Sequence, residues 1–78
     1  KLMKKKQLWE LIDKTLADMQ YIYSAPFVLR YYEDMPVKEI AEILKLSIPA
    51  TKSRILRARL ELREKLTESF AEKSNETL

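Results

Sequence analysis

The fold is decided by residues 37–57, which read VKEIAEILKLSIPATKSRILR. Apolar residues recur at spacings of three and four in each half of this stretch, which is the pattern of two amphipathic helices. The first apolar face consists of Val37, Ile40, Ala41 and Leu44, and the second begins with Ile48, Thr51 and Ile55. Ser47 is a preferred N-cap, and Pro49 fits the first turn of the helix that follows it. The stretch therefore predicts two helices joined by a tight turn at Lys45-Leu46.

Two helices joined in this way, the second of them basic on its exposed side, have the arrangement of a helix-turn-helix, which we place at about residues 36–57. Ala41 is small at the expected crossing point, so the two backbones can approach closely. Ser47 leaves the first N–H groups of the second helix and the positive end of its dipole facing outward, where they favour a phosphate. The side chains then free to enter a DNA major groove are Ile48, Pro49, Lys52, Ser53, Leu56 and Arg57. The competing interpretation is an ordinary helix crossing, which many all-α domains contain.

Two further helices are expected before this motif, so the predicted fold is all-α, with four helices around a single core in one domain. Ser24 is expected to cap the second helix, with Pro26 in its first turn, where a missing N–H has no cost. No stretch alternates with the period of two that a strand requires. The expected elements of the domain, residues 1–78, are helices at about 5–19, 24–34, 37–44 and from 48 to well past 66, a linker remnant at 1–6 and a frayed tail at about 70–78.

The composition excludes several classes of function. The 78 residues include no cysteine and no histidine, so disulfides, thiolate metal sites and the commonest general base are absent. They include no glycine, which excludes the Gly-rich loops that hold phosphates in nucleotide-binding enzymes. No apolar run approaches the roughly 18 residues of a membrane span. We therefore expect a cytoplasmic protein that is not an enzyme, with no cofactor, metal, membrane or small-molecule partner.

The net charge of +3 conceals an uneven distribution. Residues 10–44 are acidic overall, whereas residues 45–65 carry seven bases and only two acids. A block of this kind is either a solvated helix face or a surface that binds phosphates. Because the block coincides with the second helix of the predicted helix-turn-helix, DNA binding is the better interpretation.

Three segments resemble a known family. The stretches LRYYED at 29–34, EIAEIL at 39–44 and TKSRILRARLELREKL at 51–66 look like region 4 of the bacterial σ70 family of sigma factors. They are closest to its extracytoplasmic-function (ECF) group. The resemblance covers residues 16–66 well and the first helix more loosely.

The resemblance implies binding of the promoter −35 element by the second helix of the motif. Carried over by position, Lys52, Ser53, Leu56 and Arg57 match base-facing and phosphate-facing positions, and Thr51 matches an inward position. Two further arginines, Arg54 and Arg59, either contact phosphate or pair with acids of the third helix.

The same resemblance implies two protein partners. Region 4 binds the RNA polymerase core by holding the flap helix of the β subunit in an apolar hollow, and ECF members are commonly held inactive by an anti-sigma factor. The aromatic residues Phe27, Tyr31 and Tyr32 either contribute to such a hollow or belong to the core. Asp34 and Lys45 stand where the family usually has glycine, so we expect left-handed backbone at both positions.

Two alternatives of other classes remain open. The first is a different helix-turn-helix regulator that acts as a dimer on palindromic sites. The second is a helical module whose basic face binds only an acidic protein.

Overall fold

The computed structural model describes the backbone of residues 4–76 and the side chains of residues 4–71. Its helices are α1 (Lys5–Asp18), α2 (Tyr21–Tyr31), α3 (Val37–Leu44) and α4 (Ile48–Glu76). Within the described residues there is no strand, so the prediction of an all-α fold is confirmed. The boundaries of α1 and α3 and the start of α4 agree with the sequence pattern to within a residue.

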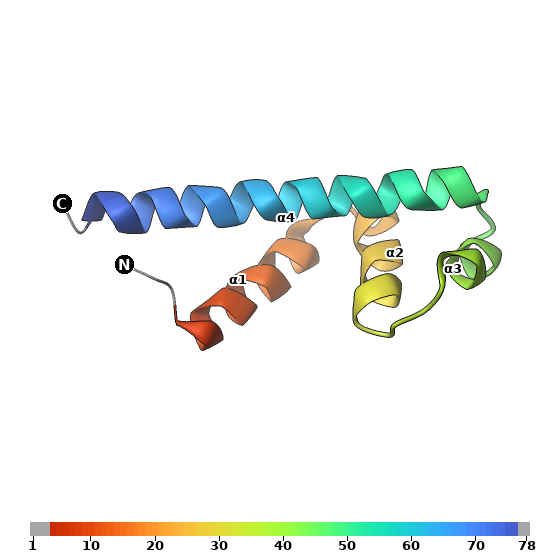
Figure 1. Ribbon diagram of the computed structural model, residues 1–78, viewed down its shortest axis with the longest axis horizontal. Helices are drawn as coiled ribbons and strands as arrows, with labels where there is room; N and C mark the ends of the chain where they lie inside the picture. The colour runs from red at the N-terminus through yellow and green to blue at the C-terminus, as the bar shows by residue number, and fades with distance from the viewer. Residues whose placement is uncertain (1–3, 77–78) are drawn as a thin grey trace.

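Helix α4 is the axis of the molecule. Its 29 residues extend along nearly the whole structure, and α1, α2 and α3 all lie on one side of it (Figure 1). It contacts each of the other three helices. The buried core joins the end of α1 to the middle of α4 through Leu16, Met19, Ala58 and Leu62. Tyr23, Phe27 and Val28 of α2 pack against this core.

Helices α3 and α4 form the predicted helix-turn-helix. The buried residues of α3 are Ile40 and Ala41, which are 0% and 4% exposed. On α4, Thr51 is 0% exposed and Ile55 is 5% exposed. These four residues belong to the two apolar faces that the sequence predicts. Ile48, predicted to begin the second face, is instead 42% exposed, so that face begins at Thr51.

Both expected left-handed turns are present. Lys45 has φ 58° and ψ 48°, and Asp34 has φ 54°. At the end of α3 the Lys45 N–H bonds to the carbonyl of Glu42, and the Leu46 N–H bonds to the carbonyl of Ala41 at 2.9 Å. This is the Schellman arrangement, which requires left-handed backbone at the position that Lys45 occupies. The chain makes this turn without glycine, at the cost of a Cβ crowded against the backbone.

The predicted start of the second helix was wrong. α2 begins at Tyr21 rather than at Ser24, and it ends at Tyr31 rather than near Asp34. Ser24 is not an N-cap, because its N–H bonds to the carbonyl of Gln20 and its side chain is buried inside the helix. Pro26 therefore lies in the interior of α2 and not in its first turn. No side chain caps the start of α2 at Gln20, so no N-cap residue marks this start in the sequence.

The two ends of the chain leave part of the predicted organisation untested. The expected linker at 1–6 lies partly outside the described residues, and Lys5 and Lys6 form the first turn of α1. The backbone of α4 is helical through Glu76, and residues 77–78 lie outside the described part. Fraying of the tail from about residue 70 stays a prediction.

Helix α1 is tied to the end of α2 by Tyr32, whose hydroxyl donates a hydrogen bond to the Asp13 carboxylate at 3.1 Å. Burial of the ring raises the pKa of Tyr32, and the hydrogen bond and negative charge of Asp13 raise it further. A raised pKa in the folded state means that the neutral phenol favours folding. The protonated Tyr32 therefore contributes its full stabilisation of the fold at pH values below the ordinary pKa of tyrosine. This stabilisation is lost as the pH rises through the pKa that Tyr32 has in the folded state.

We predict that Lys45→Gly raises the free energy of unfolding by about 1 kcal/mol, because glycine adopts left-handed backbone without a Cβ clash. The measurement is urea unfolding followed by circular dichroism. Glu42→Gly is the matched control on the exposed side of α3, and it should lower stability by about 1 kcal/mol. A loss of stability in Lys45→Gly would contradict the account of this turn.

We predict that Tyr32→Phe reduces the decline in stability between about pH 9 and about pH 11, because it removes a phenol whose folded pKa is raised. The measurement is the free energy of unfolding across this pH range. Tyr21→Phe, at a ring that is 79% exposed, controls for the loss of a phenol as such. Identical pH profiles for Tyr32→Phe and the wild type would refute the role of the contact with Asp13.

Candidate nucleic-acid interface and an adjoining apolar groove

The start of α4 is fixed by hydrogen bonds from its first turn. The Ser47 hydroxyl accepts a hydrogen bond from the Ala50 N–H at 3.2 Å, so the predicted N-cap is confirmed. The Thr51 hydroxyl donates to the Ser47 carbonyl at 2.9 Å, which satisfies the polar group of a fully buried side chain. The burial of Thr51 and Ile55 shows which side of the first turns of α4 faces inward.

The buried positions of α4 leave a continuous exposed face on its opposite side. We call this the recognition face and define it by Pro49, Lys52, Ser53 and Leu56. Helical spacing places all four residues away from the buried side of α4, which consists of Thr51, Ile55, Ala58 and Leu62. All four residues of the recognition face are exposed, and Leu56 is 48% exposed although it is apolar.

The remaining predicted residues lie at the edges of this face. Ser47 and Ile48 are exposed at the helix start, and Arg57 and Arg59 are exposed on its two flanks. Arg54 is only half-buried and lies beside Ile22 and Tyr23 of α2. The structure therefore groups eight of the nine predicted residues on the accessible sides of α4.

Arg59 reaches α2 instead of an acid of α3. Its Nη2 donates to the Tyr31 hydroxyl at 2.6 Å, and the guanidinium carbon lies 5.9 Å from the centre of the Tyr31 ring. Among the side chains of residues 4–71, neither Arg54 nor Arg59 forms an ion pair with an acid of α3. The predicted alternative of pairing with that helix is thus not observed.

Arg57 is also engaged within the domain. Its Nε donates to the Glu61 carboxylate at 3.2 Å, one turn further along α4. Its guanidinium carbon lies 5.1 Å from the centre of the Tyr23 ring, within the range of a cation–π contact.

A basic groove of about 380 Å³ adjoins the recognition face. Its three cations are Arg30 of α2 and Lys52 and Arg59 of α4. Arg30 was not among the residues predicted from the sequence, because it lies on a different helix and outside the basic block at 45–65. Its nearest acid is exposed Asp34, at 3.8 Å, so much of its charge remains available to an anion.

A second groove, of about 480 Å³, is almost entirely apolar. It lies where α1, α2 and α4 meet, and its lining residues are Trp9, Ile12, Phe27, Tyr31, Tyr32, Leu62 and Leu66. Trp9 is 50% exposed, and the two tyrosines are about as exposed. The rings of Phe27 and Tyr31 pack with their centres 4.8 Å apart. Phe27, Tyr31 and Tyr32 therefore line a surface hollow, and Phe27 also packs against the core.

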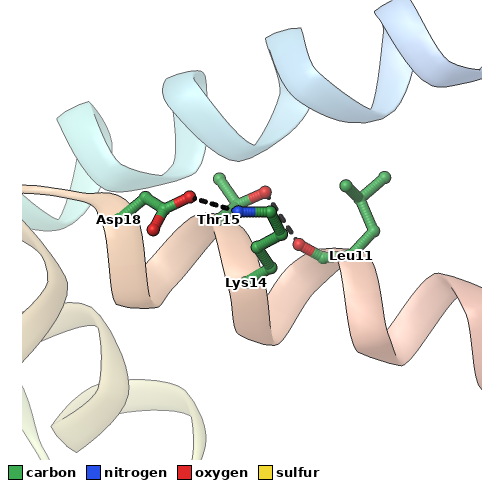
Figure 2. Close-up of polar contacts among 4 residues, drawn as sticks. All are labelled: Leu11, Lys14, Thr15 and Asp18. Carbon is green, nitrogen blue, oxygen red and sulfur yellow. Dashed lines mark hydrogen bonds and ion pairs between the residues drawn. The ribbon is translucent and has the colours of Figure 1, made fainter.

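A third, charged groove of about 600 Å³ lies between α1 and α4. Figure 2 shows its α1 wall, where Lys14 pairs with Asp18 at 2.9 Å and the Thr15 hydroxyl donates to the Leu11 carbonyl at 2.7 Å. The hydrogen bond from Lys14 to Asp18 raises the pKa of Lys14. The pair is solvent-exposed and so contributes little to stability.

Two other kinds of site are absent from the described part of the chain. No group of three or more potential metal ligands gathers there. None of the helices within residues 4–76 has the length and apolar character needed to cross a membrane.

Comparison with known proteins identifies the family. No curated protein matches the chain. Residues 9–62, more than half of the chain, match the family described as sigma-70, region 4, which is a family of DNA-binding domains and not of enzymes. The matched residues include the whole recognition face and most of the apolar groove. The chain therefore belongs to the sigma-70 region 4 family.

Proposed function

We propose that this domain binds the −35 element of a promoter through the major groove, as part of a sigma factor that directs RNA polymerase to initiate transcription. The observation that carries the proposal is the recognition face itself. It combines a donor, a small polar side chain and an exposed apolar side chain at the capped start of a helix, on a chain of the sigma-70 region 4 family. Assignment to the ECF group remains part of this proposal.

Each residue of the recognition face has a chemistry that DNA can use. Lys52 supplies a donor to guanine or phosphate, Ser53 bonds to either a base or a phosphate, and Leu56 offers an apolar contact for a thymine methyl. The basic groove beside this face would receive the neighbouring phosphates through Arg30 and Arg59. Arg54, half-buried against α2, would act at the margin of the interface.

The apolar groove supports the polymerase part of the proposal. It presents a large aromatic surface, with Trp9 and two tyrosines exposed around a hollow, and residues of this kind dominate binding energy at protein interfaces. Its walls suit the apolar face of a partner helix. We propose that the flap helix of the polymerase β subunit occupies it, and that an anti-sigma factor would compete for the exposed surfaces of this domain.

We predict that Lys52→Ala weakens DNA binding and reduces the slope of log affinity against log salt concentration by about 1, as expected for one lost phosphate contact. The measurement is fluorescence anisotropy with a duplex selected from a randomised pool by the wild-type domain. Lys6→Ala removes the same charge at the start of α1, far from α3 (Figure 1), and should leave the slope unchanged. The assignment of DNA binding to the recognition face would be overturned if the DNA affinity of the wild-type domain did not depend on salt concentration. It would also be overturned if Lys52→Ala and Lys6→Ala changed the slope equally.

We predict that a peptide with the sequence of the flap helix shifts the fluorescence of Trp9, the only tryptophan, to shorter wavelength as it covers the exposed ring. The measurement is a titration of the domain with this peptide, synthesised with any tryptophan replaced by phenylalanine. Leu66→Asp should weaken the peptide affinity by a factor of about 10 or more by placing a charge in the groove. Leu60→Asp, at an exposed position outside the groove, is its control. Equal peptide affinities for the two variants would exclude this groove as the polymerase site.

A further inference from the structure

We propose that Glu61 restrains Arg57 in the unbound domain and thereby lowers its affinity for DNA. This inference rests on the proposed DNA-binding function and deepens it. It assigns Glu61 as a positioning residue that sets how much of the basic charge of α4 is available to a phosphate or a base.

The restraint consists of two contacts on one guanidinium. The Glu61 carboxylate accepts a hydrogen bond from the Arg57 Nε at 3.2 Å, and the Tyr23 ring lies beneath the guanidinium at 5.1 Å. The first contact neutralises the charge locally, and the second holds the side chain against α2. Both partners of Arg57 lie within the domain. Glu61 lines the charged groove between α1 and α4, whereas Tyr23 lines the cavity that Ser53 also lines.

The direction of the restraint follows from helical geometry. Residues four apart on a helix are displaced by about 40° around its axis, so Ser53, Arg57 and Glu61 follow one another around the side of α4. Ser53 belongs to the recognition face, whereas Glu61 lines the charged groove between α1 and α4. Arg57 borders that groove and also the cavity that Ser53 lines. Its side chain therefore reaches either side, and Glu61 holds it on the side away from DNA.

Other charged groups near Arg57 act less directly. Asp18, across the charged groove, is already paired with Lys14. Glu64 lines the same groove, but among the described side chains it forms no ion pair with Arg57. Arg54 borders the cavity on the other side and repels Arg57. Glu61 is thus the acid whose removal should release the side chain.

The ion pair between Arg57 and Glu61 is strong enough to reduce DNA affinity but too weak to prevent DNA binding. Arg57 and Glu61 are 58% and 37% exposed, and ion pairs at such exposure are weak because water screens them. A phosphate or a guanine can displace the carboxylate. The expected effect of removing the pair is a gain in DNA affinity of about 2- to 5-fold.

The test compares two variants with the same change in charge. Glu61→Gln and Glu64→Gln each remove one negative charge from α4, so long-range electrostatics affect both similarly. Fluorescence anisotropy with the selected duplex should show that Glu61→Gln binds about 2- to 5-fold more tightly than Glu64→Gln. This difference in DNA affinity between the two variants should vanish when each substitution is combined with Arg57→Ala.

A second measurement reports on the free domain. The NMR resonance of the Arg57 Nε–H should move in Glu61→Gln and stay in place in Glu64→Gln, without DNA present. Equal DNA affinities of the two variants, or a difference that persists without Arg57, would overturn this inference while leaving the proposed function intact. A wild-type domain that binds no DNA would instead overturn the proposed function, and this inference with it.

Discussion

The burial of Thr51 in the first turn of α4 is the constraint on which the rest of the structure depends. The side chain is completely enclosed, and its hydroxyl is satisfied by the Ser47 carbonyl, so a polar group is buried there without an unpaired donor. With this position inside, the 3.6-residue period of the helix turns Pro49, Ser53 and Leu56 outward. The recognition face is thus a geometric consequence of the buried side of α4, which begins at Thr51 and continues through Ile55 and Ala58.

Helix α4 also links the two surfaces to which we assign partners. Its first turns carry the recognition face, and Leu62 and Leu66 further along form a wall of the apolar groove. Tyr31 lies between them, because its ring lines both the apolar and the basic groove and its hydroxyl bonds to Arg59. A single rigid helix therefore fixes the spacing between the surface proposed for DNA and the surface proposed for polymerase.

Local features of the fold could be predicted from the sequence, and features set by distant contacts could not. The left-handed turns at Asp34 and Lys45 were expected from the family resemblance, because the family usually has glycine at both positions. The start of α2 was not predictable, because Gln20 precedes it without a side-chain cap and so leaves no local signal in the sequence. The positions of the recognition residues followed from helical period alone. The partners of Arg57 and Arg59 on α2 did not, since no local pattern relates residues on separate helices.

The most direct test of the central claim is an NMR titration of the domain, labelled with ¹⁵N, with the selected DNA duplex. The account predicts that the largest shifts occur at backbone amides from Ser47 to Arg57, while the indole N–H of Trp9 in the apolar groove stays in place. Shifts concentrated at Trp9 and Tyr32, with the amides at the start of α4 unmoved, would contradict it.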